Sequence, residues 1–155
     1  MKFIVDAPLG GLAKWLRFCG FDAGYRSLSA GREKLPPPAA DTYILTGQQA
    51  LAGLNRADIL VISALSPLGQ LKEVLRRLKI SRRQMAPLNR CVRCNEPLTP
   101  VPRDRVQGLV PEHVFLHQRQ FYQCPRCQRI FWPGSHLPPI TAILDRALHP
   151  SRKAE

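Results

Sequence analysis

The sequence holds two C-x-x-C pairs, Cys91-Val92-Arg93-Cys94 and Cys124-Pro125-Arg126-Cys127, and 29 residues separate them. A two-residue spacer lets both sulfurs of a pair face one ion at about 2.3 Å, and four thiolates form a tetrahedral zinc site. The separation exceeds the roughly 15–20 residues of the compact pattern, but a longer loop adds little closure entropy. We predict a structural zinc ribbon with Cys91, Cys94, Cys124 and Cys127 as ligands. Redox-active pairs are the alternative, and the presence of two matched pairs argues against it.

Length and charge set the limits for the rest of the chain. With 155 residues, of which 45% are hydrophobic, it can build a packed core. A formal net charge of +12 indicates a polyanionic partner, with nucleic acid first and an acidic membrane second, or else a surface tuned for solubility. Four of five cysteines lie in the pairs, which is typical of a reducing compartment and predicts a cytoplasmic protein. No apolar run has the length of a signal peptide or a membrane span, so no membrane partner is expected.

The first 80 residues alternate between strand and helix patterns. Apolar runs predict strands at 3–5, 22–28, 42–46 and 58–63. Apolar stripes at helical spacing predict helices that begin at Pro8, Gln48 and Pro67. This order favours an α/β fold with a parallel sheet flanked by helices. We expect this domain to span 1–80, a linker 81–89, the ribbon with a terminal helix 90–149, and a tail 150–155.

Asp6 directly follows the first predicted strand. Open parallel sheets bind ligands at the carboxyl ends of their strands, so Asp6 is a candidate ligand-binding acid. A helix begins immediately after it, and Asp6 is equally suited to cap that helix. In the second case, replacing Asp6 with Asn should change folding only modestly. The sequence leaves both interpretations open.

Longer motifs surround these features. The first runs from Asp6 to Asp22 and includes Leu12-Ala13-Lys14-Trp15-Leu16-Arg17 and Gly20-Phe21-Asp22. The others are Ile44-Leu45-Thr46, Gln70-Leu71-Lys72-Glu73-Val74, Arg90-Cys91-Val92-Arg93-Cys94-Asn95, Phe121-Tyr122-Gln123-Cys124-Pro125-Arg126-Cys127 and Phe131-Trp132-Pro133-Gly134-Ser135-His136. Over nearly the whole chain, these motifs resemble the Mut-seven carboxy-terminal RNase family. The resemblance implies a PIN-like nuclease domain joined to a zinc ribbon, and an activity that uses magnesium or manganese.

The chain departs from this family at two places. The turn after the central strand reads Thr-Arg-Asp in the family, where the Asp belongs to the metal site, but here it reads Thr46-Gly47-Gln48. The acidic helix of the family is replaced by a loop with Pro36-Pro37-Pro38. Such a nuclease needs three or four carboxylates around a divalent metal. Asp6 remains, with Asp22 and Asp41 as candidate helpers.

We therefore predict an RNA-binding protein of a PIN-like RNase family with a degenerate nuclease site. The alternatives are a divalent-metal-dependent ribonuclease that acts on structured RNA, and a protein-interaction adaptor built on the ribbon. Transfer RNA and ribosomal RNA are both open as partners. Candidate RNA contacts are basic or aromatic residues near the cysteine pairs or the Asp6 edge. They are Lys14, Arg17, Arg90, Arg93, Arg126, Arg129, Trp132 and His136. Trp132 is also suited to stack on bases or to fill the ribbon core, and His136 to contact phosphate or to pack.

Overall fold

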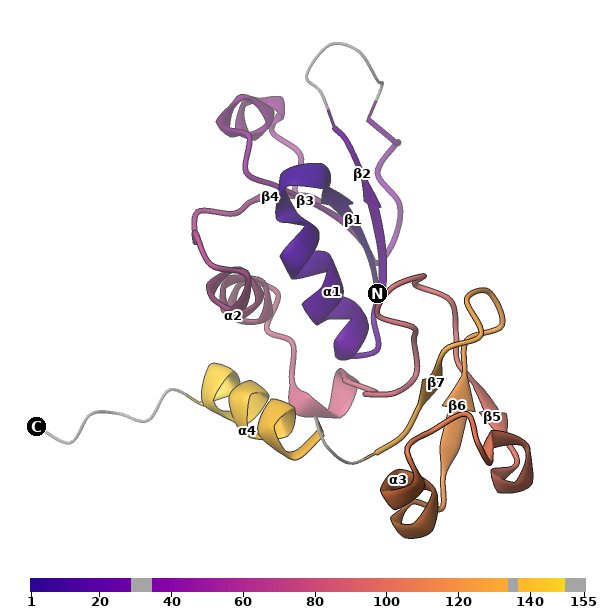
Figure 1. The fold of residues 1–155 in the computed structure, drawn as a ribbon. Helices are drawn as coiled ribbons and strands as arrows, with labels where there is room; N and C mark the ends of the chain where they lie inside the picture. The colour runs from indigo at the N-terminus through magenta and orange to yellow at the C-terminus, as the bar shows by residue number, and fades with distance from the viewer. Residues whose placement is uncertain (29–34, 134–136, 150–155) are drawn as a thin grey trace, which may run out of the picture.

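The structure is a computed structural model that describes residues 1–28, 35–133 and 137–149 (Figure 1). Its two sheets define two parts. A four-stranded sheet lies in the sheet part, which comprises the described residues up to 80. A three-stranded sheet lies in the ribbon, residues 90–133. Figure 1 shows the ribbon beside one end of the sheet part.

The large sheet is parallel throughout and has the strand order β2-β1-β3-β4. Its strands are β1 (Lys2–Asp6), β2 (Asp22–Arg26), β3 (Thr42–Thr46) and β4 (Ile59–Val61). In β3 the consecutive residues Ile44 and Leu45 are both buried, as expected for a strand covered on both faces. The α/β fold with a parallel sheet flanked by helices is thus confirmed.

Helices cover this sheet where the sequence predicts them. They are η1 (Ala7–Leu9), α1 (Gly10–Phe18), η2 (Gln49–Leu54) and α2 (Pro67–Arg77). The helix expected from Pro8 is divided into a 3-10 turn and α1. A Cβ at Gly11 would meet Pro67 Cγ at 2.6 Å, so glycine permits the close approach of α1 and α2. Gly20, with φ +92°, follows the end of α1.

The predicted linker is packed rather than free. It contains η3 (Arg82–Gln84), and Met85 joins the hydrophobic core of the sheet part. The Ala86 amide donates to Cys19 O at 2.8 Å. A Cβ on Gly20 would clash with Ala86 O. The segment therefore runs in direct contact with the end of α1.

The ribbon is an antiparallel sheet of β5 (Thr99–Val101), β6 (Phe121–Gln123) and β7 (Ile130–Phe131). The long spacer between the cysteine pairs adds η4 (Arg103–Val106) and α3 (Glu112–His117). Val106, Val110, Val114 and Phe121 form a small core there. This second core explains how the ribbon accommodates a spacer of 29 residues.

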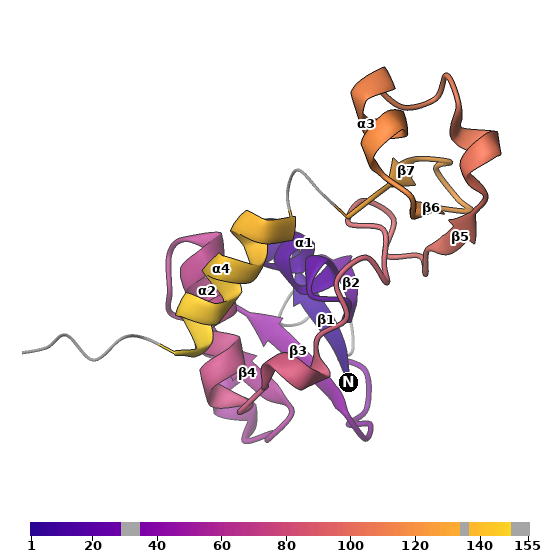
Figure 2. The ribbon, with the colours of Figure 1, turned by 90° about the horizontal axis from the view of Figure 1, so that it is seen from below.

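The terminal helix α4 (Leu137–Leu148) lies beside α2, and Figure 2 shows the two helices together. Its Leu144 is fully buried in the core of the sheet part. The sequence pattern predicts this helix as the end of the ribbon, whereas in the structure it packs on the sheet part. Within the described ranges, no helix is both long and apolar enough to cross a membrane.

Candidate functional site

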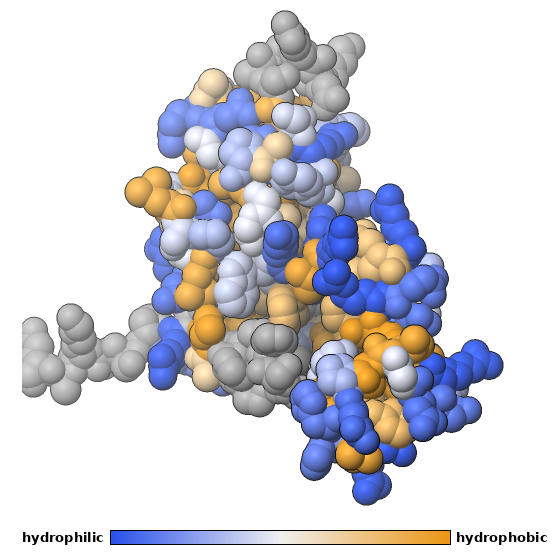
Figure 3. Space-filling view, viewed as in Figure 1, coloured by the Kyte–Doolittle hydropathy of each residue, from blue (hydrophilic) through white to orange (hydrophobic). Residues whose placement is uncertain are grey.

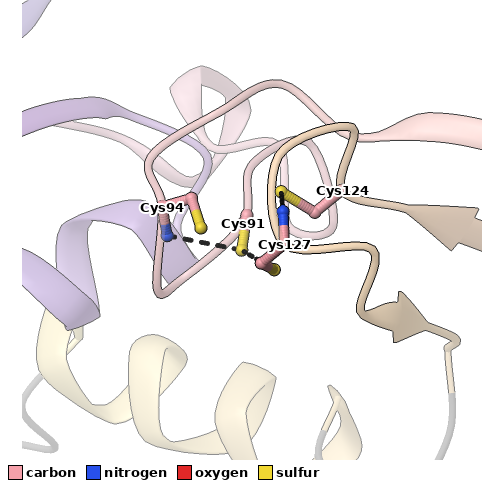
Figure 4. A group of neighbouring side chains, drawn as sticks. All are labelled: Cys91, Cys94, Cys124 and Cys127. Atoms are coloured by element: carbon pink, nitrogen blue, oxygen red, sulfur yellow. Dashed lines mark hydrogen bonds between the residues drawn. The ribbon is translucent and has the colours of Figure 1, made fainter.

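The four paired cysteines converge at the end of the ribbon that faces the sheet part (Figure 4). Their Sγ atoms all lie within 4.8 Å of one another, and Cys91 Sγ is 3.8 Å from Cys127 Sγ. Four zinc–sulfur bonds of about 2.3 Å in a tetrahedron place the sulfurs about 3.8 Å apart. A disulfide would need about 2.05 Å. The cluster is therefore spaced to hold a metal ion, and its donor set fits structural zinc.

The two cysteine pairs have the same backbone geometry. Asn95 N donates to Cys91 O at 2.9 Å, and Gln128 N donates to Cys124 O at 2.9 Å. Asn95 and Gln128 both have left-handed φ angles, 63° and 61°. In each pair the amide of the second cysteine donates to the first sulfur, at 3.4 and 3.5 Å. These repeated turns aim both sulfurs of each pair at one point.

Four thiols this close influence one another's ionisation. Desolvation and hydrogen bonding to Cys127 raise the pKa of Cys94 to about 12. A hydrogen bond from the Arg129 backbone lowers the pKa of Cys127 to about 7. A bound dication keeps coordinated thiols deprotonated, so all four cysteines can bind it as thiolates although their pKa values shift in opposite directions without it.

Arg17 on α1 clamps the first cysteine pair. Its Nε donates to Ala23 O at 2.9 Å, and its Nη1 donates to Val92 O at 3.0 Å and Arg93 O at 3.2 Å. Burial lowers the pKa of Arg17, while the neighbouring thiols and Asp22 act against this shift. The side chain predicted to contact RNA thus holds the ribbon against α1.

A second contact joins β2 to the same cysteine pair. Asn95 Nδ2 donates to Asp22 Oδ1 at 2.7 Å, and Ala23 N donates to Asn95 Oδ1 at 3.0 Å. Arg90 Nη1 donates to Asn95 O at 2.6 Å, and its Nη2 lies 3.9 Å from Asp22 Oδ2. Asp22 and Arg90, predicted for catalysis and RNA binding, therefore lie in the interface between the two parts. Asn95 is not among the residues predicted from the sequence to be functional. Its position directly after a C-x-x-C pair is the only sequence feature that could have pointed to it.

Asp6 lies at the carboxyl end of β1 and is 1% exposed. Its Oδ1 accepts hydrogen bonds from Ala7 N and Leu28 N, both at 2.9 Å. Its Oδ2 accepts from Thr46 Oγ1 at 2.8 Å and Gln48 Nε2 at 2.7 Å. The bond from Ala7 N caps η1, as one of the two interpretations of Asp6 requires. Each oxygen of the carboxylate already has two donors.

Gln48 stands where the related motif carries an acid. Its Nε2 donates to Asp6 and also to Leu28 O. Because both neighbours are acceptors, only the amide nitrogen fits between them. Apart from the cysteine cluster, no group of three or more acids, histidines or cysteines in the described residues is close enough to hold an ion.

The other two candidate acids lie at the opposite edge of the sheet. Asp22 begins β2 and pairs in register with Lys2, and Asp41 directly precedes β3. Asp41 O accepts a hydrogen bond from Lys2 N at 2.7 Å. Because the strands are parallel, their first residues gather at the amino edge, away from Asp6. The expected grouping of Asp6, Asp22 and Asp41 is therefore corrected: the structure does not bring them together.

Four of the predicted RNA contacts share one hollow of about 390 Å³, which we call the α1–ribbon hollow. It is lined by Lys14, Arg17, Val92, Arg93, Arg129 and Phe131. Figure 3 shows hydrophilic side chains at the rim of the ribbon and at its border with the sheet part, with hydrophobic ones between them.

The remaining RNA candidates lie elsewhere. Arg126 is exposed on the second cysteine pair. Trp132 packs against the ribbon core, as one of its two interpretations requires. His136 lies outside the described residues.

A parallel four-stranded sheet with a docked four-cysteine ribbon defines the class of this protein. Residues 1–144 match the family model of the Mut7-C RNAse domain, and the chain belongs to that family. The resemblance noted from the motifs is thereby confirmed. No curated protein and no solved structure matches the chain.

Proposed function

We propose that this chain is an RNA-binding member of the Mut7-C RNase family whose hydrolytic site has become degenerate and whose zinc ribbon is structural. The observation that carries the proposal is the hydrogen bond from Gln48 Nε2 to the buried carboxylate of Asp6. It stands where a nuclease of this kind needs a second acid.

The contacts of Gln48 argue against a catalytic metal at Asp6. Magnesium and manganese prefer several oxygen ligands, usually carboxylates. Turning the Gln48 amide to offer its oxygen would set that oxygen against Leu28 O, which is already an acceptor of the same amide. Among the described residues, Asp6 also lacks the neighbouring acids that a water-activating metal requires.

Binding to RNA is supported by charge and shape. The chain carries a net charge of +12, and the α1–ribbon hollow is lined by Lys14, Arg17, Arg93 and Arg129. Arginine presents several N–H donors that match phosphate oxygens. Contacts of this kind bind the backbone without reading sequence. Transfer RNA and ribosomal RNA are both suitable partners, and reduced cysteines favour a cytoplasmic location.

The binding test uses a pair of charge reversals. Arg93→Glu/Arg129→Glu should weaken binding to mixed cellular RNA at least tenfold and reduce the dependence of affinity on salt. The matched control is Arg83→Glu/Arg105→Glu, which changes two exposed arginines outside the hollow by the same charge. Absence of RNA binding by the wild type, or affinity that does not change with salt, would contradict the proposal.

Family membership favours ribonuclease activity as the second candidate function. We expect wild-type protein with added manganese to cleave structured RNA no faster than Asp6→Asn does. Cleavage by the wild type that Asp6→Asn abolishes, in preparations free of other nucleases, would establish the ribonuclease instead. A gel assay with labelled RNA measures both rates.

A further inference from the structure

A larger basic cavity lies away from the cysteine cluster, between α2, η3 and α4. Its volume is about 680 Å³, and we call it the α2–α4 cleft. Leu75, Ile80 and Leu148 supply apolar lining. Its basic lining residues are Lys72, Arg76, Lys79, Arg82, Arg146 and His149.

The cleft carries a surplus of positive charge. Among the described residues, five lysines and arginines line it, but only one acid, Glu73. The Glu73 carboxylate accepts hydrogen bonds from Ser63 N at 3.1 Å and Ala64 N at 2.9 Å, and pairs with Arg77. The Glu73 carboxylate therefore interacts with these groups and not with the cations that line the cleft.

The lining cations themselves have little compensation. Arg82 lies 3.9 Å from Asp145, whose side chain is 62% exposed. In the described part of the chain, no ion pair involves Lys72, Arg76, Lys79 or Arg146. Like charges around one cavity repel each other unless a bound anion offsets them.

Helix ends do not account for this surplus. α2 and α4 both have their carboxyl ends near the cleft, and the carboxyl end of a helix contributes about half a negative charge. Together they would offset about one of the five cations. Lys79 also has a left-handed φ of 52°, just after the end of α2, where glycine is the favoured residue. A lysine is thus held on the cleft at a position that disfavours side chains.

We propose that the α2–α4 cleft binds the phosphate groups of an RNA strand, as a contact separate from the α1–ribbon hollow. This inference rests on the proposed function and assigns a second surface to it. In the part of the chain that the structure describes, no phenylalanine, tyrosine or tryptophan lines the cleft, so it contacts the sugar–phosphate backbone rather than stacked bases. Binding at this cleft is therefore independent of sequence.

The two cavities share no lining residue. Both Figure 1 and Figure 2 place α1 between α2 and the ribbon. Lys14, which lines the α1–ribbon hollow, is exposed on α1, the helix between the two cavities. One RNA molecule can thus be held at two places on the same protein.

The test is the double variant Lys72→Glu/Arg76→Glu, since both side chains are exposed on α2. Affinity for a single-stranded RNA is measured by fluorescence anisotropy from about 50 to about 200 mM salt, a range over which phosphate contacts weaken strongly. We expect a loss of about tenfold or more, and a salt slope smaller by about two units. Arg83→Glu/Arg105→Glu, with the same change in charge, should lose distinctly less.

Each result has a separate meaning. If the cleft variant equals the Arg83→Glu/Arg105→Glu control while Arg93→Glu/Arg129→Glu loses binding, the cleft inference is overturned and the proposed function stands. If wild-type protein binds no RNA, the proposed function fails and this inference with it. If the cleft variant loses binding only to phosphatidylserine vesicles, the cleft is a membrane contact and the RNA assignment is overturned. Thermal melting checks that the variants are folded. If the cleft variant is not folded, Lys72→Gln/Arg76→Gln takes its place.

Discussion

At the scale of single residues, Asp6 is the centre of a closed hydrogen-bond network. Four donors from three segments of the chain meet its two oxygens: Ala7, Leu28, Thr46 and Gln48. The strand pattern was enough to predict the location of Asp6 at the carboxyl edge. The orientation of the Gln48 amide was not predictable, because it is fixed by Leu28 O, twenty residues earlier in the chain.

The first prediction concerns Asp6→Asn. This change turns one acceptor oxygen into a donor, which then faces another donor in a buried place. We expect the free energy of unfolding to fall by about 2–4 kcal/mol, measured by urea denaturation. The cap interpretation alone predicted only a modest loss. Asp41→Asn, at an exposed site, is the control and should change stability by less than about 0.5 kcal/mol. Equal stability of the two variants would contradict the prediction that the hydrogen bonds of Asp6 stabilise the fold.

The second prediction concerns Gln48→Asp. The new carboxylate would lie beside the buried one of Asp6, and two like charges this close repel. Without added manganese we expect a melting temperature below that of the wild type, and with millimolar manganese a partial recovery, because a cation relieves the repulsion. Gln49→Asp places the same acid on an exposed neighbour and should show neither the loss nor the recovery. If manganese does not change the melting temperature of Gln48→Asp, one added acid is not enough to create a metal site at Asp6.

At the scale of elements, the ribbon is fixed to α1 and β2 by polar contacts. Arg17 and the pair Asp22–Asn95 join segments more than 70 residues apart. Sequence periodicity predicts α1, β2 and each cysteine pair separately, because these depend on neighbouring residues. It could not predict their docking, since nothing local identifies Asn95 as the partner of Asp22.

The third prediction tests this docking. Asn95→Ala removes the bonds to Asp22 and Ala23 and leaves the amide of the buried residue Ala23 without its acceptor. We expect a loss of about 2–3 kcal/mol in the free energy of unfolding. Gln128→Ala is the matched control: it has the same left-handed φ in the other cysteine pair, but its side chain bonds only to Pro125 O. A loss as large for Gln128→Ala would assign the effect to the turn rather than to the docking.

At the scale of the whole molecule, sheet part and ribbon were both predicted, and the position of α4 was not. An amphipathic pattern shows that a helix has an apolar face, but not which surface that face covers. Leu144 inserts into the core of the sheet part, so the ribbon lies, in sequence, between two segments that pack together.

The fourth prediction concerns zinc removal. Since metal binding supplies much of the folding free energy of such ribbons, a strong chelator should unfold the ribbon, as should Cys124→Ser. The effect should reach the sheet part through Ala23 N, which donates to Asn95 Oδ1. Hydrogen exchange followed by mass spectrometry should show loss of protection at Ala23. The amide of Ile44 donates to Asp58 O, within the sheet part, and should keep its protection.

Two outcomes would contradict this prediction. One is purified protein without zinc that is nevertheless fully folded. The other is release of zinc with unchanged exchange at Ala23, which would show that the ribbon and the sheet part are not coupled.

The return of α4 to α2 also has a consequence for biosynthesis. The ribosome makes the sheet part first and the ribbon next, but the core residue Leu144 comes only with α4. Until that helix has left the exit tunnel, the apolar face of α2 that it covers remains open on the nascent chain, where chaperones bind such surfaces. Folding of the first domain is therefore completed only after the second has been translated.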